Sequence, residues 1–454
     1  MKNILALCIS FCLLTNVIAQ IAVNTDGSAA NASAMLDVKS SNKGVLIPRI
    51  STAQRNAIVS PAPGLFVFDS TERTLYMFDG IQWLGFAALN DQQRPVNNFI
   101  TAPTKQDTTL AGYSVSMWDQ FAAIGAPYTT INGTLYSGAV YIYHFNGSTW
   151  QYFTTLSSTT TAGALLGISV SLKGNYLIAG APGQQDASSS PVGAAYVYYY
   201  NGTSWGLLQT IFGSTPSIGF GNVVNINQFG NYAAISAPQA TVSAVNNAGM
   251  VNIYFNSGAS LALEQSISDP SPVDGEYFGT AMAINPGGNN IIVGAPSKTV
   301  GSYTGDGYVG QFDRSGGTWS QTHNYTPPPD NNQAIGQQVD INDSYVIFSV
   351  GKTKTVDYLS LDWSGYNISI PDNINSIALD PTSNNVFVFA GSSIYEANNG
   401  TTATQVKNIA ISNTNFFVTQ LIGAYNKKYV AGIPTSAIPA QPYEGVYIFG
   451  TGPY

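Results

Sequence analysis

The stretch Ala179-Gly180-Ala181-Pro182 ends a short apolar run, and the same phrase returns along the chain at a nearly fixed interval. Successive copies lie 55, 56 and 58 residues apart. Self-similarity of this kind indicates one supersecondary unit that is repeated in space. The four copies are Gly125-Ala126-Pro127, Gly180-Ala181-Pro182, Ser236-Ala237-Pro238 and Gly294-Ala295-Pro296.

Each copy predicts four strands. A glycine followed by alternating apolar residues, as at Gly167 with Val170 and Leu172, indicates a first strand with one buried face. The second strand ends at the proline, because proline cannot donate a hydrogen bond to a ladder. A third strand begins at another glycine, such as Gly193, and a tryptophan such as Trp205 begins the fourth. Four antiparallel strands in each repeat are typical of a propeller blade.

Seven such units follow one another toward the C-terminus, and the last lacks its fourth strand. Its first two strands are expected at residues 416–421 and 429–434. The strand-like piece Asn98-Phe99-Ile100-Thr101 is expected to complete its sheet, because an unpaired edge strand invites aggregation. We therefore predict an all-β chain in which residues 91–454 form a seven-bladed β-propeller of four-stranded antiparallel blades. A six-bladed ring is the alternative, if the sixth copy is an insertion.

The first 19 residues predict a cleavable signal peptide. Lys2 gives a positive start, residues 4–14 an apolar core, and Val17-Ile18-Ala19 a cleavage site of small residues. Both cysteines, Cys8 and Cys12, would be removed with it, so we expect no disulfide. No later apolar run is long enough for a membrane span. The expected product is secreted or located at the cell surface.

Residues 20–90 predict a separate small β-rich module with one short helix. Ser51 or Thr52 is expected to cap that helix, which would extend to Ile58. The other phrases of this region predict short strands and a hairpin. Residues 88–96 are polar and predict a linker.

The glycine that begins each blade has a phenylalanine before it at Phe220-Gly221 and Phe278-Gly279. Together with the Gly-Ala-Pro phrases, it resembles the FG-GAP repeat of integrin α-subunit propellers and of bacterial exported proteins. This resemblance covers residues 97–454 and implies the propeller fold. Residues 20–90 resemble a module of Bacteroidota surface proteins and of phage tail fibres. That resemblance implies a spacer or anchor, and leaves a homo-oligomer formed through this module as an open alternative.

We do not carry metal binding over from the integrin-type blades, which often have an Asp-rich calcium loop between their first two strands. The corresponding turns here, such as Lys173-Gly174-Asn175 and Asn342-Asp343-Ser344, lack carboxylates at alternate positions. Calcium needs such oxygen ligands. We therefore predict no metal and no cofactor.

The composition also bears on partners and chemistry. Only 9% of the residues are charged and the formal net charge is −8, so nucleic acid is not an expected partner. His144 and His323 form no metal-ligand spacing. No pair of loop carboxylates stands out for glycoside cleavage, and we expect these acids to be solvated turn residues. They are Asp186, Asp269, Asp274, Glu276, Asp306 and Asp330. We predict no catalytic residue.

The candidate ligand contacts are Tyr128, Tyr136, Tyr303 and Asp186, which follow the Gly-Ala-Pro phrases. In the propellers that this chain resembles, these loops form one face, which commonly meets ligands. Exposed loop aromatics can stack on sugars or bind a protein partner. We therefore expect an exported, non-enzymatic recognition or adhesion protein that binds a glycan or an extracellular protein. Two alternatives stay open: a polysaccharide hydrolase or lyase, and a structural subunit of an extracellular assembly.

Overall fold

The chain forms two compact units, residues 1–91 and residues 92–454. The computed structural model describes residues 20–71, 74–78, 80, 83–86, 98–101, 110–146, 149–157, 161–256, 260–326, 330, 332–351, 353–380, 384–390, 393–397, 403–408, 422–425, 428–433 and 445–450. The predicted signal peptide, the predicted linker at 88–96 and the predicted strand at 416–421 lie outside the described residues.

The N-terminal unit contains two small sheets. Strands β1 (Ile21–Val23) and β2 (Leu36–Val38) pair in parallel. A four-stranded sheet follows, in which the first pair is parallel and the others are antiparallel. Its strands are β3 (Arg49–Ile50), β4 (Phe66–Asp69), β5 (Thr74–Phe78) and β6 (Trp83–Phe86).

Helix α2 (Thr52–Asn56) covers this second sheet and has a complete capping box. The Ser51 hydroxyl accepts from the backbone N–H of Gln54, while the Gln54 side chain accepts from the backbone N–H of Ser51. The predicted cap is thus confirmed. The guanidinium of Arg55 lies 3.7 Å from the centre of the Tyr76 ring and 3.4 Å from Asp69 Oδ2. This buried contact fixes the helix on the sheet.

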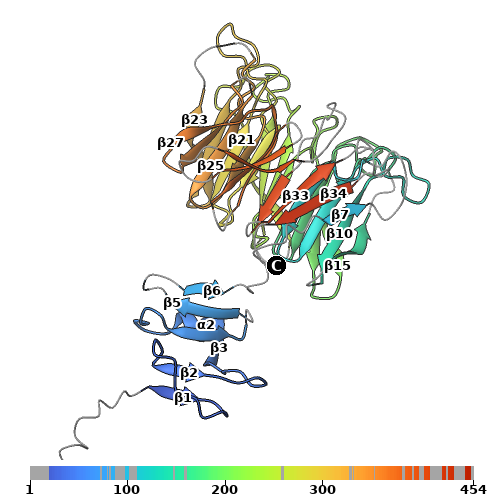
Figure 1. Ribbon diagram of the computed structural model, residues 1–454. Coiled ribbons are helices and arrows are strands. Elements are labelled where there is room, and N and C mark those ends of the chain that lie inside the picture. The colour runs from blue at the N-terminus through green and yellow to red at the C-terminus, as the bar shows by residue number, and fades with distance from the viewer. Residues whose placement is uncertain are drawn as a thin grey trace, which may run out of the picture. The chain divides into compact units, whose positions relative to one another are not determined.

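The C-terminal unit is a propeller of antiparallel sheets (Figure 1), as predicted. Among the described strands between residues 98 and 450, there are seven four-stranded sheets. The first three contain β8 (Ser114–Trp118), β9 (Phe121–Ala126), β10 (Ala139–Phe145) and β11 (Trp150–Leu156); β12 (Val170–Lys173), β13 (Tyr176–Ala181), β14 (Ala194–Tyr200) and β15 (Trp205–Phe212); β16 (Val224–Ile226), β17 (Tyr232–Ala237), β18 (Met250–Asn256) and β19 (Leu261–Ile267).

The other four sheets follow the same order along the chain. They contain β20 (Ala281–Ile284), β21 (Asn290–Gly294), β22 (Val309–Ser315) and β23 (Thr318–Tyr325); β24 (Val339–Ile341), β25 (Tyr345–Val350), β26 (Thr355–Ser360) and β27 (Gly365–Ser369); β28 (Ile374–Leu379), β29 (Val386–Ala390), β30 (Ser393–Ala397) and β31 (Thr404–Asn408); β32 (Ile422–Tyr425), β33 (Lys428–Ile433), β34 (Gly445–Gly450) and β7 (Asn98–Thr101).

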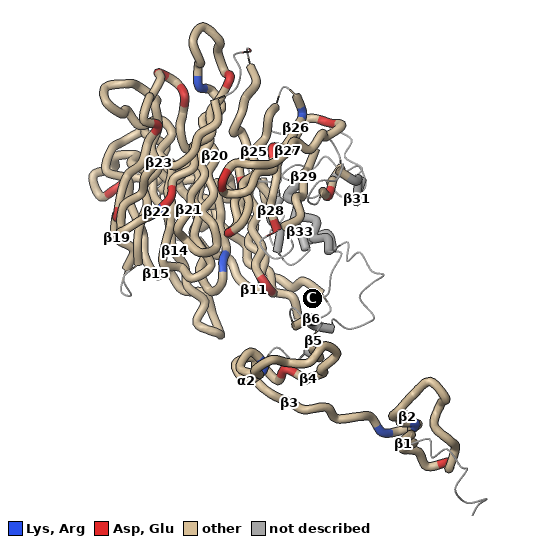
Figure 2. Tube along the Cα trace, turned by 90° about the vertical axis from the view of Figure 1, so that its left-hand side faces the viewer, with Lys and Arg blue, Asp and Glu red and all other residues tan. Residues whose placement is uncertain are grey.

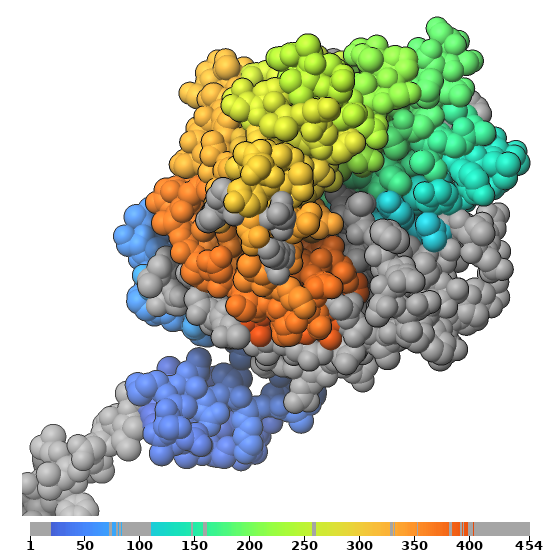
Figure 3. Space-filling model, turned by 90° about the horizontal axis from the view of Figure 1, so that it is seen from above, coloured from blue at the N-terminus to red at the C-terminus, as the bar shows by residue number. Residues whose placement is uncertain are grey.

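The ring is closed by the strand that precedes the first blade. β7 pairs antiparallel with β34, with Ile100 opposite Val446, so the predicted role of residues 98–101 is confirmed. The first strand of each sheet contacts the first strand of the next, and β32 of the last sheet contacts β8 of the first. Figure 3 follows the described blades in chain order around the ring, from cyan through green and yellow to orange.

The paired glycines of the repeat have a steric cause. Within a blade, the N–H of Gly167 donates to the carbonyl of Gly180 at 2.9 Å. Between blades, a Cβ added to Gly180 would stand 1.9 Å from the carbonyl oxygen of Gly221. Gly125 and Gly294 face the next blade in the same way, at 2.1 and 2.0 Å. The Gly-Ala-Pro glycine is therefore the place where the backbones of two blades meet without room for a side chain.

Side chains at one position of the first strands also join the blades. The hydroxyl oxygens of Ser116 and Ser171 accept from the N–H groups of Leu172 and Ile226, at 3.0 and 3.2 Å. We call Ser116, Ser171, Asn225 and Asp340, which all accept from the next blade in this manner, the axial belt. It satisfies backbone N–H groups of four first strands, on the edge of each strand that has no partner in its own sheet.

The turns between first and second strands also join neighbouring blades. Asn285 Oδ1 accepts from the N–H groups of Asn289 and Asn290, both at 2.9 Å, while its Nδ2 donates to Asp343 Oδ1 of the next blade at 2.6 Å. Asn342 repeats this arrangement one blade later, with Asn384 as its acceptor. Asparagine side chains that bond to both their own turn and the next blade thus occupy the turns in which integrin-type blades often have calcium loops.

Charged side chains are few and widely spaced along the tube of Figure 2. Within the described part of the chain, no helix has the length and apolar character needed to cross a membrane.

Candidate recognition surface

Four loops of equal length follow the second strands of the first four blades. They run from the proline of the repeat phrase to the glycine before the third strand, and we call them the crown loops. They are residues 127–138, 182–193, 238–249 and 296–307. One hydrogen bond closes the base of each, as from the N–H of Gly138 to the carbonyl of Thr129 at 3.0 Å.

The crown loops are also bonded to the segment that enters the next blade. In the first loop, the carbonyl of Tyr136 accepts from the N–H of Leu165 at 3.1 Å. In the third, the carbonyl of Asn247 accepts from Tyr277 at 3.0 Å, and in the fourth that of Gly305 accepts from Ala334 at 2.9 Å. Each of these loops is thus held at its base and along one side, which fixes its shape before any ligand binds.

The structure brings two of the predicted contact residues together. The rings of Tyr128 and Tyr136 meet edge to face with centroids 5.7 Å apart, and Tyr113 adds a third ring 6.5 Å from Tyr128. Tyr136 is 45% exposed, and its neighbour Leu135 is exposed as well. Sequence analysis did not identify Tyr113. Tyr113 directly follows Gly112, the glycine that begins the first blade. This position is the sequence feature from which it could have been identified.

The other two predicted residues lie on crown loops of different blades. Tyr303 is exposed in the fourth blade, where its backbone pairs with Val300. Asp186 lies in the second blade, and its Oδ1 accepts from the N–H groups of Ser188 and Ser190 at 2.8 and 3.0 Å. That oxygen therefore shapes its own loop. Ligand contacts of all four residues stay predictions.

The expectation of solvated loop acids is wrong for Asp269, Glu276 and Asp306, which are buried. Asp269 and Glu276 lie on the connection into the fourth blade, where Lys298 of the crown loop reaches both. The Lys298 ammonium pairs with Asp269 and lies 3.3 Å from Glu276 Oε2 and 4.7 Å from the centre of the Tyr308 ring. Burial, and then the charge of Asp269, raise the pKa of Glu276 to about 7.

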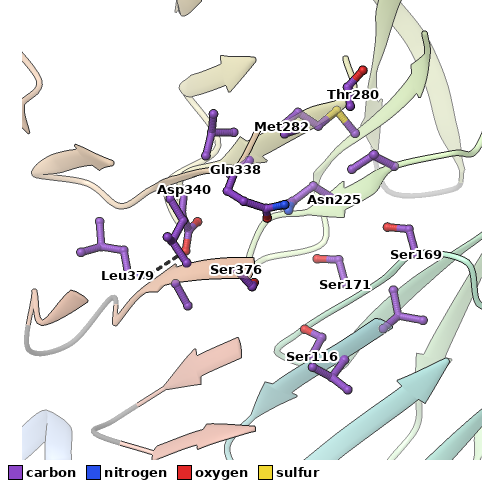
Figure 4. Close-up of a pocket in the computed structure, with 18 of the residues that line it drawn as sticks. Ser116, Ser169, Ser171, Asn225, Thr280, Met282, Gln338, Asp340, Ser376 and Leu379 are labelled. Atoms are coloured by element: carbon purple, nitrogen blue, oxygen red, sulfur yellow. Dashed lines mark hydrogen bonds between the residues drawn. The ribbon is translucent and has the colours of Figure 1, made fainter. Parts of the chain in front are cut away.

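A second feature is a cavity of about 110 Å³ on the ring axis, the axial channel (Figure 4). First strands of six blades line it, with polar side chains that include Ser171, Asn225, Gln338 and Asp340. Lys173 also lines it, and burial lowers the pKa of its ammonium. Burial likewise raises the pKa of the Asp340 carboxyl, against the opposing effect of Lys173.

The described residues contain no group of three or more His, Cys, Asp or Glu side chains placed to hold a metal ion. The polar groups of the first crown loop are hydroxyls, one amide and tyrosines, and those of the axial channel are hydroxyls and amides together with Lys173 and Asp340. Such groups bind by hydrogen bonding and stacking.

Comparison with protein families gives two matches. Residues 22–100 match the family described as phage tail like trimerisation region, and residues 156–198 match the FG-GAP repeat. The second match spans the glycine pair Gly167 and Gly180, and the first extends into β7 of the propeller. A comparison with curated proteins found no match. Propellers of FG-GAP repeats are commonly extracellular, and often serve adhesion or recognition. The chain is thus similar to a phage-tail-like trimerisation region over residues 22–100 and to an FG-GAP repeat over residues 156–198.

Proposed function

We propose that this protein is exported and acts, without catalysis, as a recognition or adhesion protein whose crown loops bind a glycan. The observation that carries this proposal is the cluster of three rings formed by Tyr128 and Tyr136, on a loop whose shape is fixed in advance, and Tyr113 beside it. Residues 127–138 contain hydroxyl and amide side chains and no charged residue. Aromatic faces beside such groups suit the apolar faces and hydroxyls of a sugar.

Export is supported by the N-terminal sequence, with its positive start, apolar core and small-residue cleavage site. The match to a repeat that is common in extracellular propellers agrees with it. A non-enzymatic role is supported by the loop carboxylates. Asp269 and Glu276 are buried beside Lys298, and Asp186 is engaged in its own turn. None of these three acids has the exposed, paired setting that glycoside cleavage requires.

A glycan array on the full chain tests the proposal. Tyr136→Ala is expected to weaken binding to any glycan hit by about 10-fold, because a half-exposed ring at the centre of a contact contributes more than about 1 kcal/mol. Tyr136→Phe keeps the ring and should keep most of the affinity.

The matched control is Tyr152→Ala, which removes a similarly exposed tyrosine, at 48%, from the outer strand β11 of the same blade. It should leave glycan binding unchanged. Equal binding by Tyr136→Ala and the unaltered chain would contradict the crown as the contact surface. An array without any hit would exclude the glycan, and leave an extracellular protein as the partner class.

A second candidate role, as a structural subunit of an oligomeric assembly, is favoured by the surface of the N-terminal unit. Strands β1 and β2 form an isolated parallel pair whose apolar side chains are exposed, with Ile21 at 59% and Leu36 at 58%. A two-stranded sheet is marginal alone in water, and so much exposed apolar surface calls for a partner. The match to a trimerisation region supports a homotrimer that would present three crowns at once.

Light scattering on the full chain is expected to give three times the mass of one chain. Leu36→Asp should shift it to the monomer mass, because a carboxylate would be buried in each of three symmetric contacts. Leu207→Asp, at a site of similar exposure (50%) on the propeller strand β15, should leave the trimer intact. If the unaltered chain is monomeric, this structural role loses its support, whereas the proposal that the crown loops bind a glycan is unaffected.

A further inference from the structure

Backbone N–H groups of the wall already occupy several acceptor oxygens of the axial channel. Ser171 Oγ accepts from the N–H of Ile226 at 3.2 Å, and Asn225 Oδ1 accepts from Ile284 at 3.5 Å. Each oxygen of Asp340 accepts a backbone N–H as well, from Ile341 and from Leu379. Figure 4 shows the Asp340–Leu379 bond, and the hydroxyl of Ser171 facing the cavity opposite the amides of Asn225 and Gln338. The side-chain oxygens of Ser171, Asn225 and Asp340 are thus engaged by backbone N–H groups of the channel wall. The hydroxyl hydrogen of Ser171 and the Nδ2 group of Asn225 can donate to a ligand.

A positive charge lines the same channel. Lys173 borders both the main cavity and a smaller one of about 20 Å³ next to it. Its Nζ lies 5.3 Å from the centre of the Trp118 ring, and the described residues place no carboxylate oxygen within ion-pair distance of it. The charged groups that act on it are Asp340 and Asp380, from across the axis. A half-buried ammonium without a close counter-ion loses hydration, and an anion would compensate for that loss.

We propose that the axial channel binds a small oxyanion, whose charge is held by Lys173 and whose oxygens accept from Ser171 and Asn225. The shared chemistry is that of a carboxylate, sulfate or phosphate group. Its source is either a free ion or the acid group of an uronic sugar. The size of the cavity admits one such group, and this site is separate from the tyrosines of the crown loops.

Calorimetric titration of the full chain at constant ionic strength tests the site, with sodium sulfate, sodium acetate, sodium glucuronate and neutral glucose as probes. We expect saturable binding of the anions and not of glucose. Lys173→Gln should weaken anion binding about 10-fold or more. Asp340→Asn should tighten it several-fold, because it removes a neighbouring negative charge and keeps an oxygen for the Leu379 N–H. Tighter binding of glucuronate than of acetate would identify the sugar as the source, and the reverse order the free ion.

Lys43→Gln, at an exposed lysine of the N-terminal unit, is the matched charge control and should change nothing. Asn225→Asp keeps the oxygen of the belt but replaces a donor by a charge, so it should abolish anion binding even if Lys173→Gln fails to fold. Weaker anion binding in Asp340→Asn would show that the Asp340 charge does not oppose the bound anion, and would overturn the proposal. Unchanged affinity in Lys173→Gln, or no saturable binding of any anion up to roughly 10 mM, would overturn it as well.

Discussion

Gly180→Ala is expected to lower the free energy of unfolding by about 3 kcal/mol or more. The added methyl group would stand 1.9 Å from the carbonyl oxygen of Gly221, and both sides of this contact are backbone, which cannot turn away as a side chain does. Gly180 does not have a positive φ, so the effect would be steric alone. Urea unfolding, followed by tryptophan fluorescence and circular dichroism, measures it.

Gly206→Ala is the matched control. Gly206 lies in β15 of the same blade, has no positive φ, and an added Cβ there meets nothing within 4 Å. Its effect should stay within about 1 kcal/mol. If the two variants unfold at the same urea concentration, the contact between repeat glycines of neighbouring blades does not limit stability.

The protein should be less stable at pH 8 than at pH 5, by about 2.5 kcal/mol from Glu276 alone. The pKa of this acid is about 7 in the fold, against an ordinary value of 4.5, so the folded state holds the proton more tightly than the unfolded state. The stabilisation is therefore lost as the pH rises from 4.5 through 7. The physical cause is that Asp269 already neutralises Lys298, so an ionised Glu276 adds an unbalanced buried charge.

Unfolding measured at several pH values between 5 and 8 checks this. Glu276→Gln removes the titrating group, and should flatten the profile across that window. Asp357, whose pKa burial raises to about 6, contributes in the same direction, so the difference between the variant and the unaltered chain isolates Glu276. Asp274→Asn, at an exposed acid of the same connection, should leave the profile as it is. If the unaltered chain instead gains stability relative to Glu276→Gln as the pH rises from 5 to 8, then Lys298 holds Glu276 ionised.

The strands could be predicted because their cause is local. Alternating apolar residues after Gly167 and the proline at 182 mark strand starts and ends without any knowledge of the neighbours. The pairing of residues 98–101 with the last blade followed from the missing strand there. Tyr128 and Tyr136 could likewise be placed on a crown loop, because the proline and glycine that bound this loop are local sequence signals.

The axial belt could not be predicted, because its partners lie in another blade. The burial of Asp269 and Glu276 could not be predicted either, because their partner Lys298 lies on a loop distant in the sequence. Ser171 bonds to Ile226, which is 55 residues away, and Lys298 pairs with Asp269, which is 29 residues away. Nothing in the residues around Glu276 distinguishes a buried acid from a solvated one. Burial there results from a crown loop that folds over the entry to its own blade.

Among the described strands of the propeller, β7, which completes the seventh sheet, is synthesised first, and its partner β34 last. The other six sheets each form from residues close together in the chain, whereas β7 waits for Gly445–Gly450. Bringing such distant segments together costs chain entropy, and pairings of this range form slowly. Ring closure is therefore a late step of folding, and any nascent chain that stops before residue 445 keeps β7 without its partner.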